Sequence, residues 1–198
     1  DLLVVKSRQT SQAAIDAWNW IVTRAISESR PVVINNSFGS HWGPHDGSDG
    51  MSAVINSLSQ NGVAFVVAAG NDGDNSIHAR AQVQQGQTIT TTFSYQSSTA
   101  LTSHLDVWYR GGDNLDFFIT DPTGRRWGPA RRGTIQNYRS SAGDFIRVDA
   151  LSAPWHNGDN WISVQITRTN TFISGNWSFA LQGLTVINGQ FDAWLPQG

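Results

Sequence analysis

A polar amide at position 71 ends a long apolar run in the sequence Val-Ala-Phe-Val-Val-Ala-Ala-Gly-Asn, which spans residues 63–71. Seven apolar residues without polar alternation indicate a strand buried on both faces, as in a parallel sheet covered by helices. In open α/β sheets, ligands bind beyond the carboxyl ends of the strands. Asn71, whose amide group can donate hydrogen bonds, is therefore a candidate residue of a binding site.

A second segment, Val32–Gly39, follows the same plan, because an apolar run is again followed by small and polar residues. If both runs are strands of one parallel sheet, their carboxyl ends meet at the same edge. We therefore expect the two segments to end side by side.

Histidines in the loop His41–Gly50 are weaker candidates. His41 and His45 lie near Asp46 and Asp49, and these residue types can ligate a metal. Loop histidines are more often simply solvated, and adjacent side chains such as His45 and Asp46 seldom form a useful catalytic pair. We therefore assign neither a metal site nor a cofactor to this chain.

Two groups in the second half of the chain raise other functions. Four arginines, at positions 125, 126, 131 and 132, surround one predicted hairpin, and such a cluster can bind phosphate, although a solvated turn is favoured. Six tryptophans lie beyond residue 81, where exposed rings could form a platform for sugars. Most are expected in a core or its rim, but Trp127 and Trp155 lie in loop-like sequence.

The first 80 residues predict alternating strands and helices. Asp1–Lys6 is a short apolar run and predicts a first buried strand. A helix capped by Ser11 follows, and a second helix after the loop ends with Gly62 in the C′ position. The inward residues at helical spacing are Ile15, Trp18, Val22, Ala25 and Ile26 in the first helix, and Met51, Val54, Ile55 and Leu58 in the second. The predicted order is β-α-β-α-β with right-handed parallel crossovers.

From about Ala81 the helical period disappears, and short β-rich runs alternate with turn residues. Asp121-Pro122-Thr123-Gly124 predicts one such turn. The candidate strands are Thr88–Tyr95, His104–Tyr109, Leu115–Asp121, Thr134–Tyr138, Gly143–Ala150, Trp161–Arg168 and Asn176–Leu184. The predicted fold class is therefore α/β plus all-β, with a partial three-layer domain over residues 1–80 and a jelly-roll-like antiparallel sandwich over residues 81–186. Residues 187–198 are predicted to return to the first domain as one more strand.

Composition narrows the classes of function. The 198 residues are 39% hydrophobic and 14% charged, as in an ordinary globular protein. A net charge of −2 provides no field for nucleic acid or an anionic membrane, and no run of about 18 apolar residues predicts a membrane span. The absence of cysteine excludes disulfides and thiolate metal sites.

The motifs Val-Ile-Asn-Asn-Ser-Phe-Gly at residues 33–39 and Ala-Ala-Gly-Asn at residues 68–71, joined by a helix, resemble the middle of a subtilisin-like serine protease. The resemblance implies that Ser37, Phe38 and Gly39 bind an extended peptide through the main chain, as an added strand. It also implies that Ala69 and Gly70 border the substrate and that Asn71 is the oxyanion-hole asparagine. An ordinary strand terminus remains the alternative for residues 37–39.

The Asp-Ser/Thr-Gly, His-Gly-Thr-His and Gly-Thr-Ser-Met-Ala motifs of that family are missing from this chain. The resemblance therefore implies an internal fragment of a larger peptidase, inactive by itself, with a polypeptide substrate and a bacterial extracellular or cell-envelope location. The resemblance is also compatible with structural calcium in the parent. The alternative is a carbohydrate- or protein-binding sandwich attached to a vestigial protease core.

Overall fold

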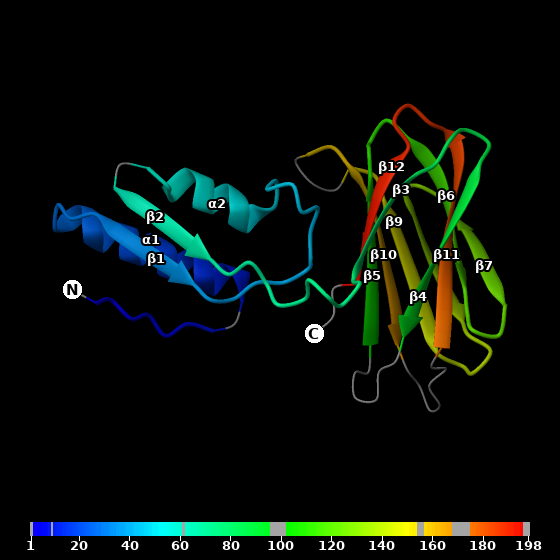
Figure 1. The fold of residues 1–198 in the computed structure, drawn as a ribbon, viewed down its shortest axis with the longest axis horizontal. Coiled ribbons are helices and arrows are strands. Elements are labelled where there is room, and N and C mark those ends of the chain that lie inside the picture. Colours follow the sequence, from blue (N-terminus) through cyan, green and yellow to red (C-terminus); the bar gives the residue numbers. More distant parts are fainter. Residues whose placement is uncertain are drawn as a thin grey trace. The chain divides into compact units, whose positions relative to one another are not determined.

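The computed structural model describes residues 2–8, 10–60, 62–95, 102–153, 157–167 and 175–195. The chain divides into two compact units, whose elements are drawn in Figure 1. The first unit consists of Asp1–Ser40 and Pro44–Gly73, and the second of His41–Gly43 and Asp74–Gly198.

The first unit contains a parallel pair of strands and two helices. In chain order these are α1 (Ser11–Ser27), β1 (Val32–Asn36), α2 (Gly50–Leu58) and β2 (Val63–Val67). The strands pair in parallel from Val32 opposite Val63 to Asn36 opposite Val67. The predicted parallel pairing of these two segments is confirmed.

One face of this strand pair forms the core of the first unit. Ile34 of β1 clusters with Ala14, Trp18 and Val22 of α1, and partly buried residues of α2 and β2 pack against them. The opposite face is open, because Val33 is 69% and Val66 is 52% exposed. The expectation of burial on both faces is therefore wrong for this chain, since the described helices cover only one face of the pair.

The start of the first unit differs from the prediction. Residues 2–8 form no strand and are exposed, because an apolar run becomes a strand only where a sheet edge accepts its hydrogen bonds. The cap of α1 is Thr10 and not Ser11: the Thr10 hydroxyl accepts a hydrogen bond from the Ala13 N–H at 3.2 Å. Helix α2 is capped by Asp49 and ends at the cap residue Ser59, so Gly62 does not occupy its C′ position.

The second unit is built from two antiparallel sheets. The six-stranded sheet has the order β3-β12-β5-β10-β9-β8, and the four-stranded sheet has the order β4-β11-β6-β7. The strand bounds are His78–Gln82 (β3), Thr88–Tyr95 (β4), Thr102–Tyr109 (β5), Asn114–Thr120 (β6), Arg126–Ala130 (β7), Thr134–Arg139 (β8), Phe145–Leu151 (β9), Asn160–Thr167 (β10), Gly175–Thr185 (β11) and Gln190–Trp194 (β12).

The two sheets share one hydrophobic core, to which alternate residues of each strand contribute. Val107 of β5, Val164 of β10, Phe117 of β6 and Trp177 of β11 are each at most 1% exposed within it. The seven predicted strands all appear, within one or two residues of their expected ends, and the turn at Asp121 closes with a hydrogen bond from the Gly124 N–H to the Asp121 carbonyl.

Three features of the second unit were not anticipated. Strands β3 and β7 were not predicted, and the boundary between the units falls after Gly73, before the expected position at 81. The segment predicted to return to the first domain instead forms β12, which pairs with β3 and β5. Its partner residues lie more than 80 positions earlier in the chain, so local sequence could not indicate them.

A buried carboxylate holds the loop before β12. Asp113 is fully buried and accepts hydrogen bonds from the backbone N–H groups of Ile187, Asn188 and Gly189 at 2.6, 3.0 and 2.8 Å. Gly189 has φ +76, and a Cβ there would lie 2.0 Å from the Val83 carbonyl oxygen. Glycine is therefore required at this position.

Candidate substrate-binding edge

The two motif segments leave the sheet at the same edge. Asn36 lies opposite Val67 in the parallel register, and the Ala68 N–H donates to the Asn36 carbonyl at 3.0 Å, which extends the pairing by one more bond. Residues 37–39 and 69–71 therefore follow directly from neighbouring strand ends. The expectation that these ends lie side by side is confirmed.

Residues after β1 are open to solvent. The Ser37 hydroxyl accepts a hydrogen bond from the Asn35 side-chain amide at 3.1 Å. Phe38 is 52% exposed, and its ring stacks on Trp18 with the centroids 6.4 Å apart and the planes 7° apart. A Cβ on Gly39 would meet no atom within 4 Å, so this backbone is accessible to another chain.

The residues after β2 are equally accessible. Ala69, Gly70 and Asn71 are all exposed. Gly70 has φ +91, a conformation that favours glycine, and a Cβ built on it would meet no atom within 4 Å. No described residue hydrogen-bonds the side chain of Asn71. The side-chain amide of Asn71 can therefore donate a hydrogen bond to a ligand. Its role as oxyanion donor stays a prediction.

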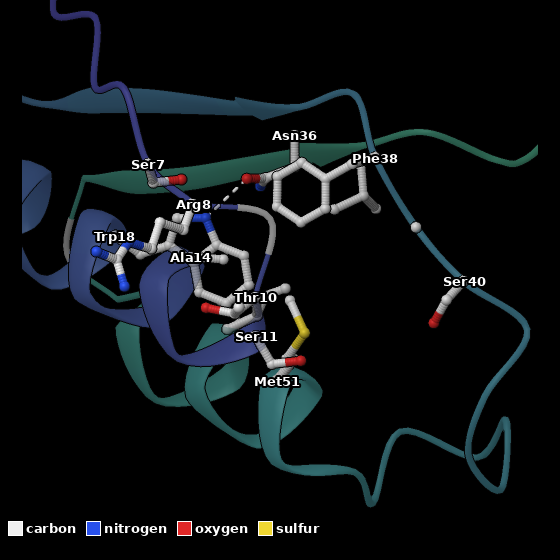
Figure 2. A pocket seen from close by; sticks show the side chains of 13 residues that line it. Ser7, Arg8, Thr10, Ser11, Ala14, Trp18, Asn36, Phe38, Ser40 and Met51 are labelled. Carbon is white, nitrogen blue, oxygen red and sulfur yellow. Dashed lines mark hydrogen bonds between the residues drawn. The ribbon is translucent and has the colours of Figure 1, made fainter.

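A pocket of about 590 Å³ opens next to this edge, within the first unit. Its walls include Phe38 and Gly39 of the edge, the start of α1, and Met51 and Ile55 of α2. Phe38 and Met51 are labelled in Figure 2. Asn36, which was not among the predicted site residues, is 3% exposed and also lines the pocket. Asn36 alternates inward with Ile34 along β1, and that period of two is the signal that could have found it.

The histidines do not assemble a reactive centre. No group of three or more His, Asp or Glu side chains able to hold a metal occurs among the described residues. His78, in β3 of the second unit, binds Asp192 at 2.7 Å and stacks on Trp194. Arg80 also donates to Asp192, and these contacts hold the pKa of the Asp192 carboxyl below its usual range despite partial burial.

The arginines around the predicted hairpin are engaged separately. Arg131 lies 3.7 Å from Asp116, and Arg132 donates to the carbonyl oxygens of Gly111 and Asp113. Arg125 and Arg126 each lie over an aromatic ring, Trp127 and Phe118 respectively. These separate contacts give no reason to propose a phosphate site.

Tryptophans of the second unit serve its packing. Trp127 is not in a loop but in β7, where it is 9% exposed and tilts against Tyr138. Trp155 lies outside the described residues. On the outward-facing side of the six-stranded sheet, Trp108 and Trp161 stack with centroids 5.5 Å apart, but Trp108 is only 4% exposed. Its ring face is therefore not presented to a sugar.

Asp106 is buried beside this tryptophan pair. It lies opposite Ser163 on β10 and is 0% exposed. Burial raises the pKa of its carboxyl from 3.8 to about 6, although the Trp161 N–H and the Ser163 hydroxyl favour the charged form. Neither carboxyl oxygen accepts a hydrogen bond of ordinary geometry from a described residue, so these two groups stabilise the charge only weakly.

The profile of the subtilase family, peptidase S8, matches residues 2–172. The chain belongs to the subtilase family. Among solved structures, the CspB protease of Clostridium perfringens is similar, with a TM-score of 0.83 and 20% sequence identity. The match covers 95% of this subtilase chain but only 40% of the CspB chain.

Two further findings are negative. A search of curated proteins found nothing similar to this subtilase chain. Among the residues that the structure describes, no helix combines the length and the apolar character needed to cross a membrane.

Proposed function

We propose that this chain is part of a subtilisin-like serine endopeptidase and supplies one wall of its substrate cleft. In this proposal a polypeptide substrate lies extended along Ser37, Phe38 and Gly39 on one side, with Ala69 and Gly70 on the other. The observation that supports it is the parallel register of β1 and β2, which brings both motif segments to one edge. Open backbone at Gly39 and Gly70 suits main-chain pairing with a peptide.

Asn71 is the proposed oxyanion donor. During acyl transfer the substrate carbonyl oxygen becomes negative, and a fixed amide N–H directed at it stabilises the transition state by roughly 3 to 4 kcal/mol. That magnitude is the one measured for subtilisin itself. The exposed, unbonded side chain of Asn71 is compatible with this role.

The second unit is proposed to be a jelly-roll domain inserted between the oxyanion asparagine and the nucleophile of the complete enzyme. Its sheet orders, and the adjacency of its first and last strands, support that assignment. We further propose a location outside the bacterial cytoplasm, which rests on family membership alone.

Kinetics of the complete protease test the proposal. Asn71→Ala is expected to lower kcat by roughly 10²-fold to 10³-fold with little change in KM, because the donor engages the tetrahedral oxyanion and not the ground-state carbonyl. An unchanged kcat with a raised KM would make Asn71 a substrate contact, and no change in either would make it scaffold. The 198-residue chain alone should not react with a fluorophosphonate probe, since the Asp, His and Ser motifs are absent from it.

A further inference from the structure

The pocket beside Phe38, described above, has a composition that selects its occupant. Its apolar lining includes Ala14 from α1 and Met51 and Ile55 from α2. Its polar groups come from Ser7, Arg8, Thr10, Ser11, Asn36 and Ser40, and no Asp or Glu is among the described residues that line it. In the described part of the chain, the pocket therefore combines apolar contact surface with hydrogen-bond donors and one cation, without a competing carboxylate.

The orientation of the Asn36 amide is fixed by its neighbour. The Trp18 indole N–H donates to Asn36 Oδ1 at 2.7 Å, the bond drawn as a dashed line in Figure 2. Because an indole nitrogen can only donate, the oxygen of this amide must face Trp18. The NH₂ group then has no acceptor among the described residues: Asn36 Nδ2 is buried and makes no hydrogen bond with any of them. A buried donor without a partner is costly, so an acceptor brought by a ligand would be favoured.

Positive charge gathers at the same pocket. The guanidinium of Arg8 forms no ion pair with any described residue. Helix α1 begins here with Thr10 as its cap, and its first turn carries no acidic residue. The positive end of the 17-residue helix dipole is therefore not neutralised by its own sequence. An anionic group is the complement to these features.

We propose that this pocket binds an acidic side chain, glutamate or aspartate, of the polypeptide substrate. The proposal rests on the proposed function, because Phe38 and Gly39 belong both to the peptide-binding edge and to the pocket wall. A peptide extended along that edge directs alternate side chains to the same side. The methylene groups of a glutamate would contact the apolar lining, and its carboxylate would accept hydrogen bonds from Asn36 Nδ2 and Arg8.

Binding of short peptides to the 198-residue chain tests this assignment without any turnover. The probes are acetyl-Ala-Ala-Glu-Ala-Ala-amide and its Gln and Met counterparts, which can slide until the central side chain enters the pocket. Dissociation constants and shifts of the Asn36 side-chain amide resonances are measured by NMR. The Glu peptide is expected to bind about tenfold more tightly than the Gln peptide and to move the Asn36 resonances.

Variants separate charge from shape. Arg8→Gln should remove most of the preference for the Glu peptide over the Gln peptide. Arg8→Glu should reverse the charge preference, so that a Lys peptide binds better than the Glu peptide. Arg30→Gln makes the same charge change outside the pocket and should leave the preference for the Glu peptide intact. Asn36→Leu should reduce Glu binding, with the dispersion of the other resonances showing that the fold is kept. Equal binding of all three probes, no binding of any, or a preference untouched by Arg8→Gln would overturn the proposal.

Success or failure here is distinguishable from the catalytic test. Peptide binding to the chain requires only the first unit, whereas the Asn71→Ala experiment measures turnover by the complete enzyme. A preference for the acidic peptide together with an unchanged kcat for Asn71→Ala would support the pocket proposal and contradict the oxyanion assignment. No acidic preference together with a lowered kcat would contradict only the pocket proposal.

Discussion

Replacing Asp106 by asparagine should stabilise the second unit at neutral pH. The carboxyl group is fully buried on β5, and its folded-state pKa of about 6 lies above the ordinary value of 3.8. Folding therefore opposes ionisation of this group. Asp106→Asn keeps the shape of the side chain while removing the charge.

The magnitude follows from the size of the pKa shift. A rise from 3.8 to about 6 corresponds to about 3 kcal/mol, because each pKa unit is worth about 1.4 kcal/mol. Since the folded state binds the proton more tightly, the contribution of Asp106 to stability is fully present below about pH 3.8 and is lost as pH rises through about 6. At pH 7.5 the variant should therefore exceed the wild type by up to about 3 kcal/mol, less the cost of burying an unbonded amide.

The assay is urea unfolding at pH 4 and pH 7.5, monitored by hydrogen exchange in peptides from β5 and β10. The difference between variant and wild type isolates Asp106 from other carboxylates, and it should be large at pH 7.5 and small at pH 4. Asp149→Asn is the matched control: Asp149 is on β9 of the same sheet, is partly exposed and pairs with Arg147, so its loss should change stability by less than about 1 kcal/mol. A pH-independent difference for Asp106→Asn, or destabilisation at pH 7.5, would refute the argument.

Two further substitutions test buried polar contacts. Trp18→Phe removes the indole N–H and leaves Asn36 Oδ1 without its donor, so stability of the first unit should fall by about 1–3 kcal/mol, read from exchange of the α1 amides. An unchanged exchange rate would mean that the bond is not formed in solution. Asp113→Ala leaves three backbone N–H groups without an acceptor, so stability should fall by about 3 kcal/mol or more and hydrogen exchange at residues 187–189 should be faster. Asp113→Asn should lose less stability because it keeps one acceptor oxygen. A loss under about 1 kcal/mol for Asp113→Ala would contradict the capping role.

The strands of the second unit were largely predictable because their alternation is strong. In β9, for example, Ile146, Val148 and Ala150 point inward between polar neighbours. The sequence pattern does not predict strand β3, because its inward residues are the small Ala79 and Ala81, which give a weak apolar signal. The pattern does not predict strand β7 either, because it contains Gly128 and Pro129, residues that usually mark a turn.

The candidate site was only partly predictable. Sequence motifs selected Asn71 and residues 37–39, and the parallel register brings them to one edge. The pocket could not be foreseen, because it depends on how the Trp18 ring orients the Asn36 amide across 18 positions of sequence. Nor could sequence tell that Val33 and Val66 lie on an uncovered face, since exposure depends on which layers pack there.

The adjacency of β3 and β12 has a consequence for engineering. His78 at the start of β3 lies opposite Trp194 at the end of β12, so the ten-stranded segment 78–194 begins and ends at neighbouring points. A host protein can therefore accept this unit in a surface turn at the entropic cost of a short loop. The same geometry makes the unit suitable for excision, replacement by a brief linker, or transplantation into an unrelated scaffold.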